Sequence, residues 1–313
     1  MRWADALLDR LRGLPWAVVV AGLVALQLLA LAALARSGDW TYLAGDAAGG
    51  AALVTAELVL LYGIGHVLGG PLFGLGAGLL WIVAPLVLLR YWVVGGSPPT
   101  DFTPIYHDRF LPAAFGFQAP GAVAAGCLLL ASAWLVLAAL GRPQLTAIAA
   151  GAAAGGAALA QPRVWPALAA PVLAFAIARK PRTALLCAVA ALTGLGALAL
   201  FRNVPGIHPG WHTMGASLDH FREFSWSRRV LEYLPLAGLI GLARRSPAAA
   251  VFFGWLLVTV ILFPLGRPLD LLPLLDALVP GLPAYALLAA SVAFLVPHRR
   301  PVAAAAVQPR VVR

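Results

Sequence analysis

Two carboxylic acids and a phenol follow the first long apolar stretch of the chain at a spacing that suits chemistry. Asp39, Tyr42 and Asp46 are three and four residues apart, so a helix would turn them toward similar directions. A carboxylate beside an apolar segment can act as a general base toward a hydroxyl group when partial burial raises its affinity for a proton. An N-cap or a solvated loop acid is the alternative interpretation of Asp39, and the spacing alone leaves both open.

A second polar segment, residues 90–118, contains Asp101 and the sequence His107-Asp108-Arg109. Asp108 can orient a substrate hydroxyl, and Arg109 can pair with that carboxylate or with an anion. Aromatic residues surround this group, which is also typical of the aromatic belt at a membrane interface. Asp108 and Arg109 are therefore candidate substrate-binding residues.

Arginines in two later segments are candidates to bind phosphate. Arg228 and Arg229 close the segment 202–230, and Arg267 lies in the segment 265–280. A guanidinium group matches phosphate oxygens in a bidentate manner and stabilises negative charge that develops in a transition state. The segment 202–230 could equally lie flat on a bilayer with its arginines on lipid phosphates, and the sequence favours neither role.

No metal site is predicted. His107 and Asp108 would need at least one more ligand, which the sequence does not identify. The segment 202–230 also holds three histidines, but a Pro209-Gly210 break makes a shared helical face for zinc improbable. The sequence identifies no cofactor, and it leaves open whether the protein needs a divalent metal.

These candidates lie in a chain of 313 residues, of which 62% are apolar and only 11% are charged. This composition excludes a soluble globular domain and predicts an all-α polytopic membrane protein. The net charge of +10 does not indicate nucleic acid as a partner, because the basic residues lie between hydrophobic stretches rather than on a water-soluble face. Abundant alanine and arginine, with Lys180 the sole lysine, resemble the codon bias of a GC-rich bacterial genome.

Apolar stretches suited to membrane helices recur along the whole chain. A cleaved signal peptide is the alternative for the first stretch, although its apolar core is longer than usual. A re-entrant pair is the alternative for the fifth and sixth stretches. We expect about ten transmembrane helices, at 16–35, 51–68, 72–89, 119–140, 145–161, 166–178, 183–201, 231–243, 247–264 and 281–296.

The distribution of charge predicts how these helices are oriented. With the N-terminus inside, the inner segments hold thirteen of the 22 basic residues in about a third of the loop length, as the positive-inside rule requires. Ten of the twelve acids lie beyond the N-terminal tail, almost all of them in the outer segments. We therefore expect both termini in the cytoplasm and a working face outside the plasma (inner) membrane. Residues 1–297 form a single transmembrane domain, and 298–313 a disordered cytoplasmic tail.

Three ionisable residues fall within the predicted spans: Glu57, His66 and Glu232. Such residues are functional candidates because a charge in a bilayer is costly unless it is paired or hydrated. Glu57 and Glu232 are also compatible with a hydrated position near the outer interface, and His66 with the end of a packed helix.

Small residues predict close helix packing. The patterns Gly74-x-x-x-Gly78 and Gly151-x-x-x-Gly155 let helix backbones approach each other. Arg244-Arg245-Ser246-Pro247 predicts a turn between two helices, because proline disfavours a helix interior. Cys127 and Cys187 both lie in apolar stretches, so we expect them to pack in the core rather than to form a disulfide.

The sequence resembles the GT-C superfamily of membrane glycosyltransferases, which use a polyprenyl-phosphate-linked sugar as donor. The resemblance rests on three features: Gly38-Asp39-Trp40-Thr41-Tyr42 after the first span, the small-residue helix from Thr146 that runs into Gln161-Pro162-Arg163, and the closing stretch from Ala243-Arg244-Arg245 to Pro280-Gly-Leu-Pro283. Members are usually longer, often with more spans, and an acid pair found in some branches is absent here because Trp40 follows Asp39.

The resemblance implies an inverting sugar transfer on the outer face. Asp39 would be the general base, while Asp46, Asp108 and the outer arginines would hold substrate and phosphate. The implied partners are membrane lipid, a polyprenyl-phosphate sugar donor and a cell-envelope glycan or lipid acceptor. Two other classes stay open: a transporter or lipid flippase with Glu57 and His66 as its gate, and a catalytically inactive membrane scaffold.

Overall fold

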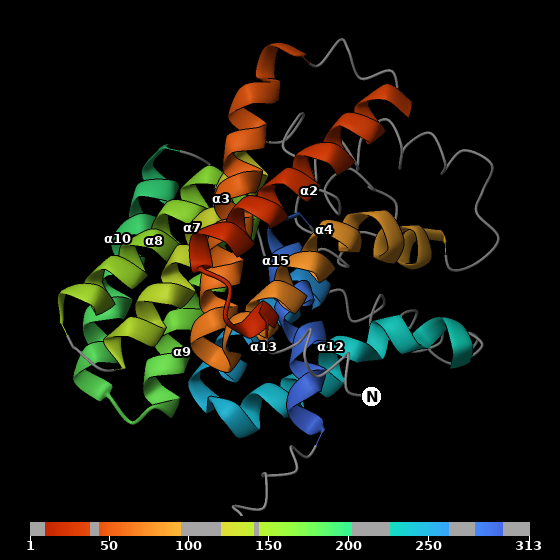
Figure 1. Cartoon of the computed structure of the whole chain (residues 1–313). Coiled ribbons are helices and arrows are strands. Elements are labelled where there is room, and N and C mark those ends of the chain that lie inside the picture. Colours follow the sequence, from red (N-terminus) through yellow and green to blue (C-terminus); the bar gives the residue numbers. More distant parts are fainter. Residues whose placement is uncertain are drawn as a thin grey trace, which may run out of the picture.

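The structure of the chain is a computed structural model that describes residues 10–37, 44–94, 120–140, 144–201, 226–262 and 279–296. Side chains are described for residues 10–33, 49–83, 120–140, 144–201, 234–259 and 279–296. Throughout these ranges the regular structure is helical, which confirms the all-α prediction (Figure 1). The predicted cytoplasmic tail lies outside the described residues.

The helices correspond closely to the apolar stretches of the sequence. Their bounds are α2 (Trp16–Ser37), α3 (Ala44–Gly69), α4 (Pro71–Val94), α7 (Pro120–Ala139), α8 (Leu145–Ala160), the 3₁₀ helix η3 (Pro162–Leu168), α9 (Ala169–Ile177), α10 (Pro181–Phe201), α12 (Trp226–Arg245), α13 (Pro247–Leu262), η5 (Val279–Gly281), α15 (Leu282–Ala290) and η6 (Ser291–Leu295).

Four of the described helices are long and apolar enough to cross a membrane. Shorter apolar stretches of 10 to 17 residues are found in the rest of the searched residues. One of them, Pro71–Val83, is the first part of α4, whose 24 residues continue to Val94. The predicted number of ten crossings is therefore not confirmed. The candidate crossing segments are Trp16–Ala33, Gly49–Gly69, Pro120–Ala139 and Pro181–Phe201.

Glycine allows the sharp reversal between α3 and α4. Gly70 connects the two helices with a φ of 85°, a left-handed conformation that costs glycine little. Past this turn the helices pack closely, because a side chain at Gly74 would overlap the carbonyl oxygen of Tyr62 and one at Gly78 would press on Leu58. The predicted Gly74-x-x-x-Gly78 contact is thus confirmed, with α3 as the neighbour.

The contacts of α7 establish its direction. The Cys127 thiol donates to the carbonyl of Leu53 at 3.1 Å, and the Trp134 ring covers Gly63, so α7 runs parallel to α3. Helix α8 runs antiparallel to α7, because the Ser132 hydroxyl donates to the Ala150 carbonyl at 2.8 Å. Gly121, near the start of α7, lies against the carbonyl of Ala160 at the end of α8. Helix α8 therefore follows nearly the full length of α7.

Helices α10 and α12 complete the pattern of directions. Gly151 and Gly155 of α8 face α10, with Gly155 against Gly194, so these helices run parallel and the second glycine prediction is also confirmed. Gly238 and Gly241 of α12 lie against the carbonyl oxygens of Leu288 and Ser291, which makes α12 parallel to the α15–η6 segment.

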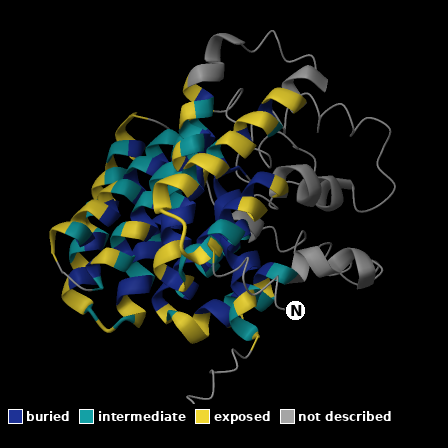
Figure 2. Ribbon diagram, viewed as in Figure 1, coloured by how far each residue is buried: buried dark blue, intermediate teal, exposed yellow. Residues whose placement is uncertain are grey.

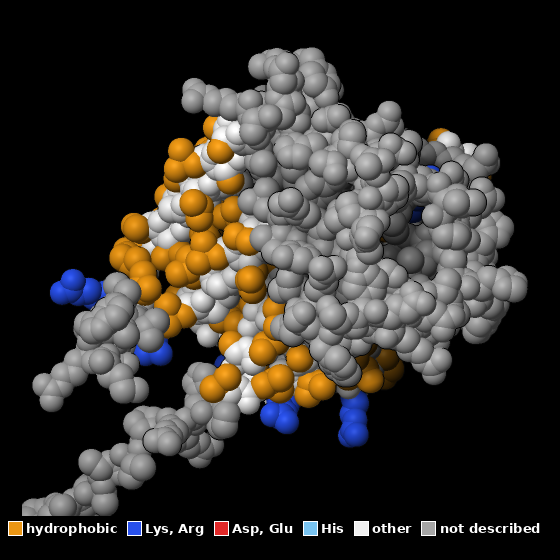
Figure 3. Space-filling view, turned by 90° about the vertical axis from the view of Figure 1, so that its right-hand side faces the viewer, with side chains coloured by type: hydrophobic (Ala, Val, Ile, Leu, Met, Phe, Trp, Pro, Cys, Tyr) orange, Lys and Arg blue, Asp and Glu red, His pale blue; other side chains and the backbone are white. Residues whose placement is uncertain are grey.

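Basic side chains tie helix ends together at one end of the bundle. Arg245, the last residue of α12, donates from Nε to the Leu68 carbonyl of α3 at 2.9 Å. Lys180, which precedes α10, donates from Nζ to the carbonyl of Leu140 at 2.6 Å and of Ala139 at 3.3 Å. A cation at a helix C-terminus also interacts favourably with the helix dipole. We call this end, marked by Lys180, Arg244 and Arg245, the basic end; several Lys and Arg side chains project from the lower edge of the hydrophobic surface in Figure 3.

The predicted turn at the basic end is confirmed. Helix α12 ends at Arg245 and α13 begins at Pro247, with Ser246 between them. The Ser246 hydroxyl accepts a hydrogen bond from the Ala249 amide at 3.3 Å, which caps the new helix. Proline in the first helical position removes a backbone donor that would have no intrahelical partner.

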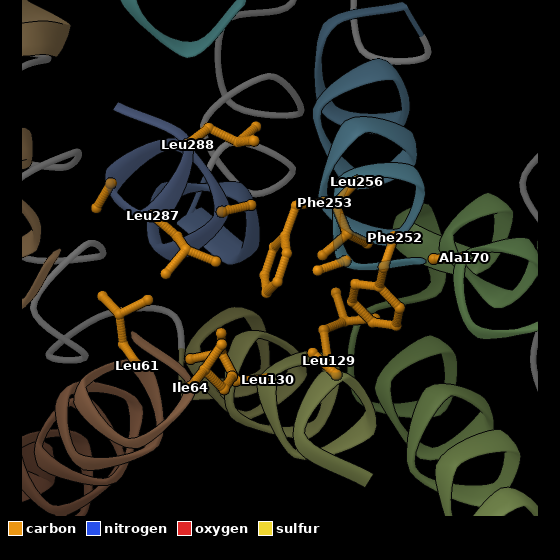
Figure 4. Packing of buried hydrophobic residues seen from close by; sticks show 14 of the residues in the cluster. Leu61, Ile64, Leu129, Leu130, Ala170, Phe252, Phe253, Leu256, Leu287 and Leu288 are labelled. Carbon is orange, nitrogen blue, oxygen red and sulfur yellow. The ribbon is translucent and has the colours of Figure 1, made fainter. Parts of the chain in front are cut away.

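The centre of the bundle is a single large hydrophobic core. Leu61 and Ile64 of α3, Leu130 of α7, Phe253 of α13 and Leu287 of α15 converge there (Figure 4). The Trp255 indole of α13 donates to the Pro166 carbonyl of η3 at 2.8 Å, and this hydrogen bond joins η3 to the core helices. Exposed side chains lie on the outward faces of the peripheral helices, as expected for surfaces that meet lipid (Figure 2).

The segment predicted at 166–178 differs from a continuous helix. Residues Pro162–Leu168 form a 3₁₀ helix, and only Ala169–Ile177 are α-helical. Proline at positions 162, 166 and 171 removes backbone donors in this stretch, which favours short tight turns over one long helix.

Candidate functional site

All of the long polar segments adjoin the end of the bundle opposite the basic end. Helices α3, α7 and α12 end at the basic end, so their first residues lie at the opposite end of the bundle. Helices that run in the other direction have their last residues at that opposite end: α2, α4, α10 and α13. The residues between these helix ends are 38–43, 95–119, 202–225 and 263–278. We call this the polar-segment end, and Figure 1 shows the helices that lead to it.

Most of the predicted site residues lie outside the described residues. This applies to Asp39, Tyr42, Asp108, Arg109 and Arg267, so the structure neither brings them together nor separates them.

The remaining predicted site residues lie in described helices, although their side chains are not described. Asp46 is in the first turn of α3, and Arg228 and Arg229 are in the first turn of α12. Since α3 and α12 both begin at the polar-segment end, the structure places the backbone of this acid and of these two arginines at the same end.

A buried acid that the sequence analysis left undecided is the most unusual polar group in the described core. Glu57 is 1% exposed, and its Oε1 atom has no hydrogen-bond partner. The hydrated position near an interface that the sequence allowed is therefore wrong for Glu57. The cause is tertiary: α7 and η5, distant in sequence, cover this face of α3.

Gly126 of α7 provides the space for this carboxyl group. A side chain at position 126 would overlap Oε1 of Glu57 and would also lie 3.5 Å from the Cα atom of Pro280 in η5. Pro280 has no backbone N–H to offer the carboxyl. The neighbouring Cys127 thiol is already directed to the Leu53 carbonyl. The carboxyl group is thus enclosed by backbone atoms of α7 and η5, and no donor to its Oε1 atom is described.

Glu57 lies within the packed core, which continues on both sides of it along α3. It is one helical turn from Leu61 on α3, toward the polar-segment end, and Gly126 is one turn from Leu130 on α7 in the same direction. Both leucines belong to the central core (Figure 4). One turn further in the same direction, Val54 of α3 and Val123 of α7 are again fully buried, so the acid and the glycine interrupt the two hydrophobic stripes at a single level.

His66 does not share this site. Nine residues separate it from Glu57, which corresponds to about two and a half helical turns and so to the opposite face of α3. The His66 ring is exposed and stacks on Tyr62, with ring centroids 6.0 Å apart and planes at 13°. The two residues consequently do not form the paired gate that a transporter interpretation would require.

Arg163 is a cation at the polar-segment end that the sequence analysis did not count among the candidates for phosphate. It lies in η3, immediately after the end of α8, and its side chain is exposed. The signal was present in the Gln161-Pro162-Arg163 turn, because this turn joins two helix ends on the side predicted to be outside. Among the arginines and lysine whose side chains are described, the others belong to the basic end or to the segment before α2: Arg10, Arg12, Arg179, Lys180, Arg182, Arg244 and Arg245.

Two more buried polar groups lie near Gly78, where α2, α3 and α4 meet. Gln27 of α2 has neither amide atom paired, and the indole nitrogen of Trp81 on α4 is also without a partner. Gly78 is packed against Leu23 and Leu58, so Gln27, Trp81 and Glu57 each lie within about one turn of that contact. In the described part of the chain, all buried side-chain atoms without a partner belong to these three residues.

The described residues contain no group of three His, Cys, Asp or Glu side chains that could hold a metal ion. Both cysteines are free thiols, and Cys187 is buried as expected for core packing.

No protein-family model, curated protein or solved structure matches the chain.

Proposed function

We propose that this protein is an integral membrane glycosyltransferase that takes its sugar from a polyprenyl-phosphate donor. The observation that carries the proposal is the arrangement of the helix ends. Every long polar segment adjoins the end of the bundle opposite the basic one, and these segments contain Asp39, Asp108, Arg109 and Arg267. Arg228 and Arg229 lie in the first turn of α12, at the same end. With the basic end in the cytoplasm, the polar-segment end faces outward and meets lipid-linked substrates.

The proposed reaction inverts the anomeric carbon. The acceptor hydroxyl loses its proton to Asp39 as its oxygen attacks that carbon, and the bond from carbon to the phosphate oxygen breaks with its electron pair. Polyprenyl phosphate leaves, and a glycosylated glycan or lipid is formed. General-base catalysis of this kind contributes on the order of a hundredfold or more to the rate. Tyr42, Asp46 and Asp108 orient the acceptor or hold the arginines.

Arginine stabilises the leaving phosphate in this proposal. Arg109, Arg228, Arg229 and Arg267 come from three different polar segments. Arg163 adds a fifth cation at the same end, on the described 3₁₀ helix η3. Guanidinium groups suit this task because they bind phosphate in a bidentate manner and are always charged.

Transport is the rival function, and the unpartnered polar groups of α2, α3 and α4 are the observation in its favour. A transport path needs polar groups that continue through the bundle. Below Glu57 the central core is lined by apolar side chains, among them Leu61, Ile64 and Leu130, and His66 lies on the opposite face of α3. Sugar transfer therefore accounts for more of the arrangement.

Purified protein in lipid nanodiscs tests the proposal. A panel of radiolabelled polyprenyl-phosphate hexoses and pentoses is supplied with a lipid extract as acceptor source, and release of free polyprenyl phosphate is measured together with label in the acceptor. Both products, in equal amounts, are expected from one donor of the panel. Movement of a lipid-linked sugar across a liposome membrane without either product would instead support the transporter.

A further inference from the structure

We propose that the turn between α9 and α10 binds the headgroup of an anionic phospholipid, in the membrane leaflet that meets the basic end. Arg179 and Arg182 contact the headgroup phosphate, and the exposed apolar face of α10 carries an acyl chain. Bulk phospholipid, rather than a scarce lipid such as polyprenyl phosphate, is the expected occupant. This turn lies at the opposite end of the bundle from the candidate site for sugar transfer, so the two can be tested separately.

The backbone of Arg179 is the unusual feature of the turn. Its φ is 57°, and among the residues that the structure describes it is the one non-glycine residue with a positive φ. Helix α9 ends here, with the amides of Arg179 and Lys180 donating to the carbonyls of Ala176 at 2.9 Å and Phe175 at 3.0 Å. Glycine is the usual residue at this point of a helix end, because a Cβ atom is costly in the left-handed region. An arginine here reduces stability, and such a cost is typical of positions that serve function.

The two guanidinium groups are free to meet a ligand from outside. Arg179 and Arg182 are both exposed, and no hydrogen bond or ion pair of either side chain is found among the described residues. Lys180, between them, already donates to the carbonyls at the end of α7. None of the acids in the described ranges lies in a turn of the basic end: Asp46, Glu57 and Glu232. An external anion is therefore the complementary partner of this turn.

An exposed apolar stripe continues along α10 from the arginine. Arg182, Leu185, Val189 and Leu192 are spaced by three, four and three residues, so they share one face of the helix. The three apolar side chains are 66%, 55% and 60% exposed. Helix α10 is long and apolar enough to cross a membrane, so this stripe suits contact with acyl chains. The guanidinium at its head then lies at the level of the lipid headgroups.

The chemistry selects an anionic headgroup over a zwitterionic one. Guanidinium binds phosphate in a bidentate manner, and basic residues beside a membrane are attracted to anionic lipid. Phosphatidylcholine has the same phosphate, but its own ammonium group offsets the charge that attracts the arginines. Phosphatidylglycerol is therefore expected to bind more tightly than phosphatidylcholine with the same acyl chains.

The test titrates the full-length protein in neutral detergent with these two lipids and measures bound lipid by native mass spectrometry. Arg179→Gly is expected to weaken binding of phosphatidylglycerol roughly three- to fivefold. Its unfolding temperature without lipid should equal or exceed that of wild type, because glycine relieves the left-handed backbone. Arg182→Ala should weaken binding by a similar factor, and the double variant roughly tenfold or more. Arg244→Ala removes an exposed arginine from the same end and is the matched control, with an expected change below about twofold.

Three results would overturn the proposal. Wild type could bind the two lipids equally, or Arg244→Ala could weaken binding as much as Arg179→Gly, which would show a diffuse attraction to positive charge. Unchanged binding of phosphatidylglycerol by Arg182→Ala would also overturn it, and this variant decides the question if Arg179→Gly proves unstable. Each of these results leaves the proposed sugar transfer intact, because transfer is measured by its own products.

Discussion

The Oε1 atom of Glu57 occupies the space that a side chain at Gly126 would need. This relationship links α3 to α7, 69 residues further along the chain, at a level that the hydrophobic core encloses on both sides. Which side chains are tolerated at position 126 therefore depends on the residue at position 57, and the reverse also holds.

Gly126→Ala is therefore expected to destabilise the protein by about 1 to 3 kcal/mol, because the new methyl group displaces a buried carboxyl. Gly76→Ala in α4 is the matched control, since nothing lies within 4 Å of the position of its added methyl group. That change should be neutral or stabilising, as in other helices. Thermal unfolding in detergent measures both variants.

A double-mutant cycle identifies the origin of this effect. With Glu57→Ala in the background, the methyl group at position 126 has room, and the cost of Gly126→Ala should fall to within about 0.5 kcal/mol of zero. An unchanged cost in that background would show that contacts other than Glu57 exclude a side chain at this position.

Arg245 and Arg244 provide a second matched pair, at the basic end. Both side chains are exposed, and Arg245 donates to the Leu68 carbonyl at the end of α3, whereas no hydrogen bond of Arg244 is found among the described residues. Arg245→Ala is expected to cost about 1 to 2 kcal/mol through loss of a charge-assisted hydrogen bond at a helix C-terminus. Arg244→Ala should change stability by less than about 0.5 kcal/mol. Equal effects in the two variants would argue that bulk charge, not the bond, matters.

The orientation of the bundle can be tested with introduced cysteines. Ser97→Cys and Ser217→Cys lie in polar segments, and Arg142→Cys lies between α7 and α8 at the basic end. A membrane-impermeant maleimide applied to intact cells should label the first two variants but not the third. Labelling of the third variant before permeabilisation would reverse the proposed orientation. The background is low, because Cys187 is buried and Cys127 is hydrogen-bonded.

Substitutions of Arg163 and Arg182 allow a comparison of two exposed arginines at opposite ends of the bundle. If Arg163 contributes to phosphate binding, Arg163→Ala should weaken binding of polyprenyl phosphate by roughly two- to fivefold, as expected for an exposed charge pair. Arg182→Ala, at the start of α10, should not change it. The effect on binding should shrink further as salt concentration rises. Binding that responds equally to both substitutions would reflect nonspecific attraction.

The helices were largely predictable from the sequence, because their signal is local. Apolar length located most elements to within a few residues, and Ser246-Pro247 marked the boundary between α12 and α13. The 3₁₀ helix η3 was not predicted, although Pro162 and Pro166 supply its physical cause. Composition indicates an apolar stretch but not its internal geometry.

The environment of Glu57 could not be predicted, because its burial depends on segments that are distant in the sequence. The same residue on an isolated helix could lie in water at an interface, and only the approach of Gly126 and Pro280 decides otherwise. The spacing of Asp39, Tyr42 and Asp46 indicates what chemistry is possible but not which groups meet. That part of the site stays a prediction.

The most direct test of the account is the rate of sugar transfer by Asp39→Asn in protein with the wild-type unfolding temperature. Asp219→Asn, an acid in another polar segment, serves as the matched control. We expect Asp39→Asn to lose on the order of a hundredfold or more in the release of polyprenyl phosphate while Asp219→Asn keeps most of it. Transfer at the wild-type rate by Asp39→Asn would contradict the proposed role of Asp39 and with it the mechanism.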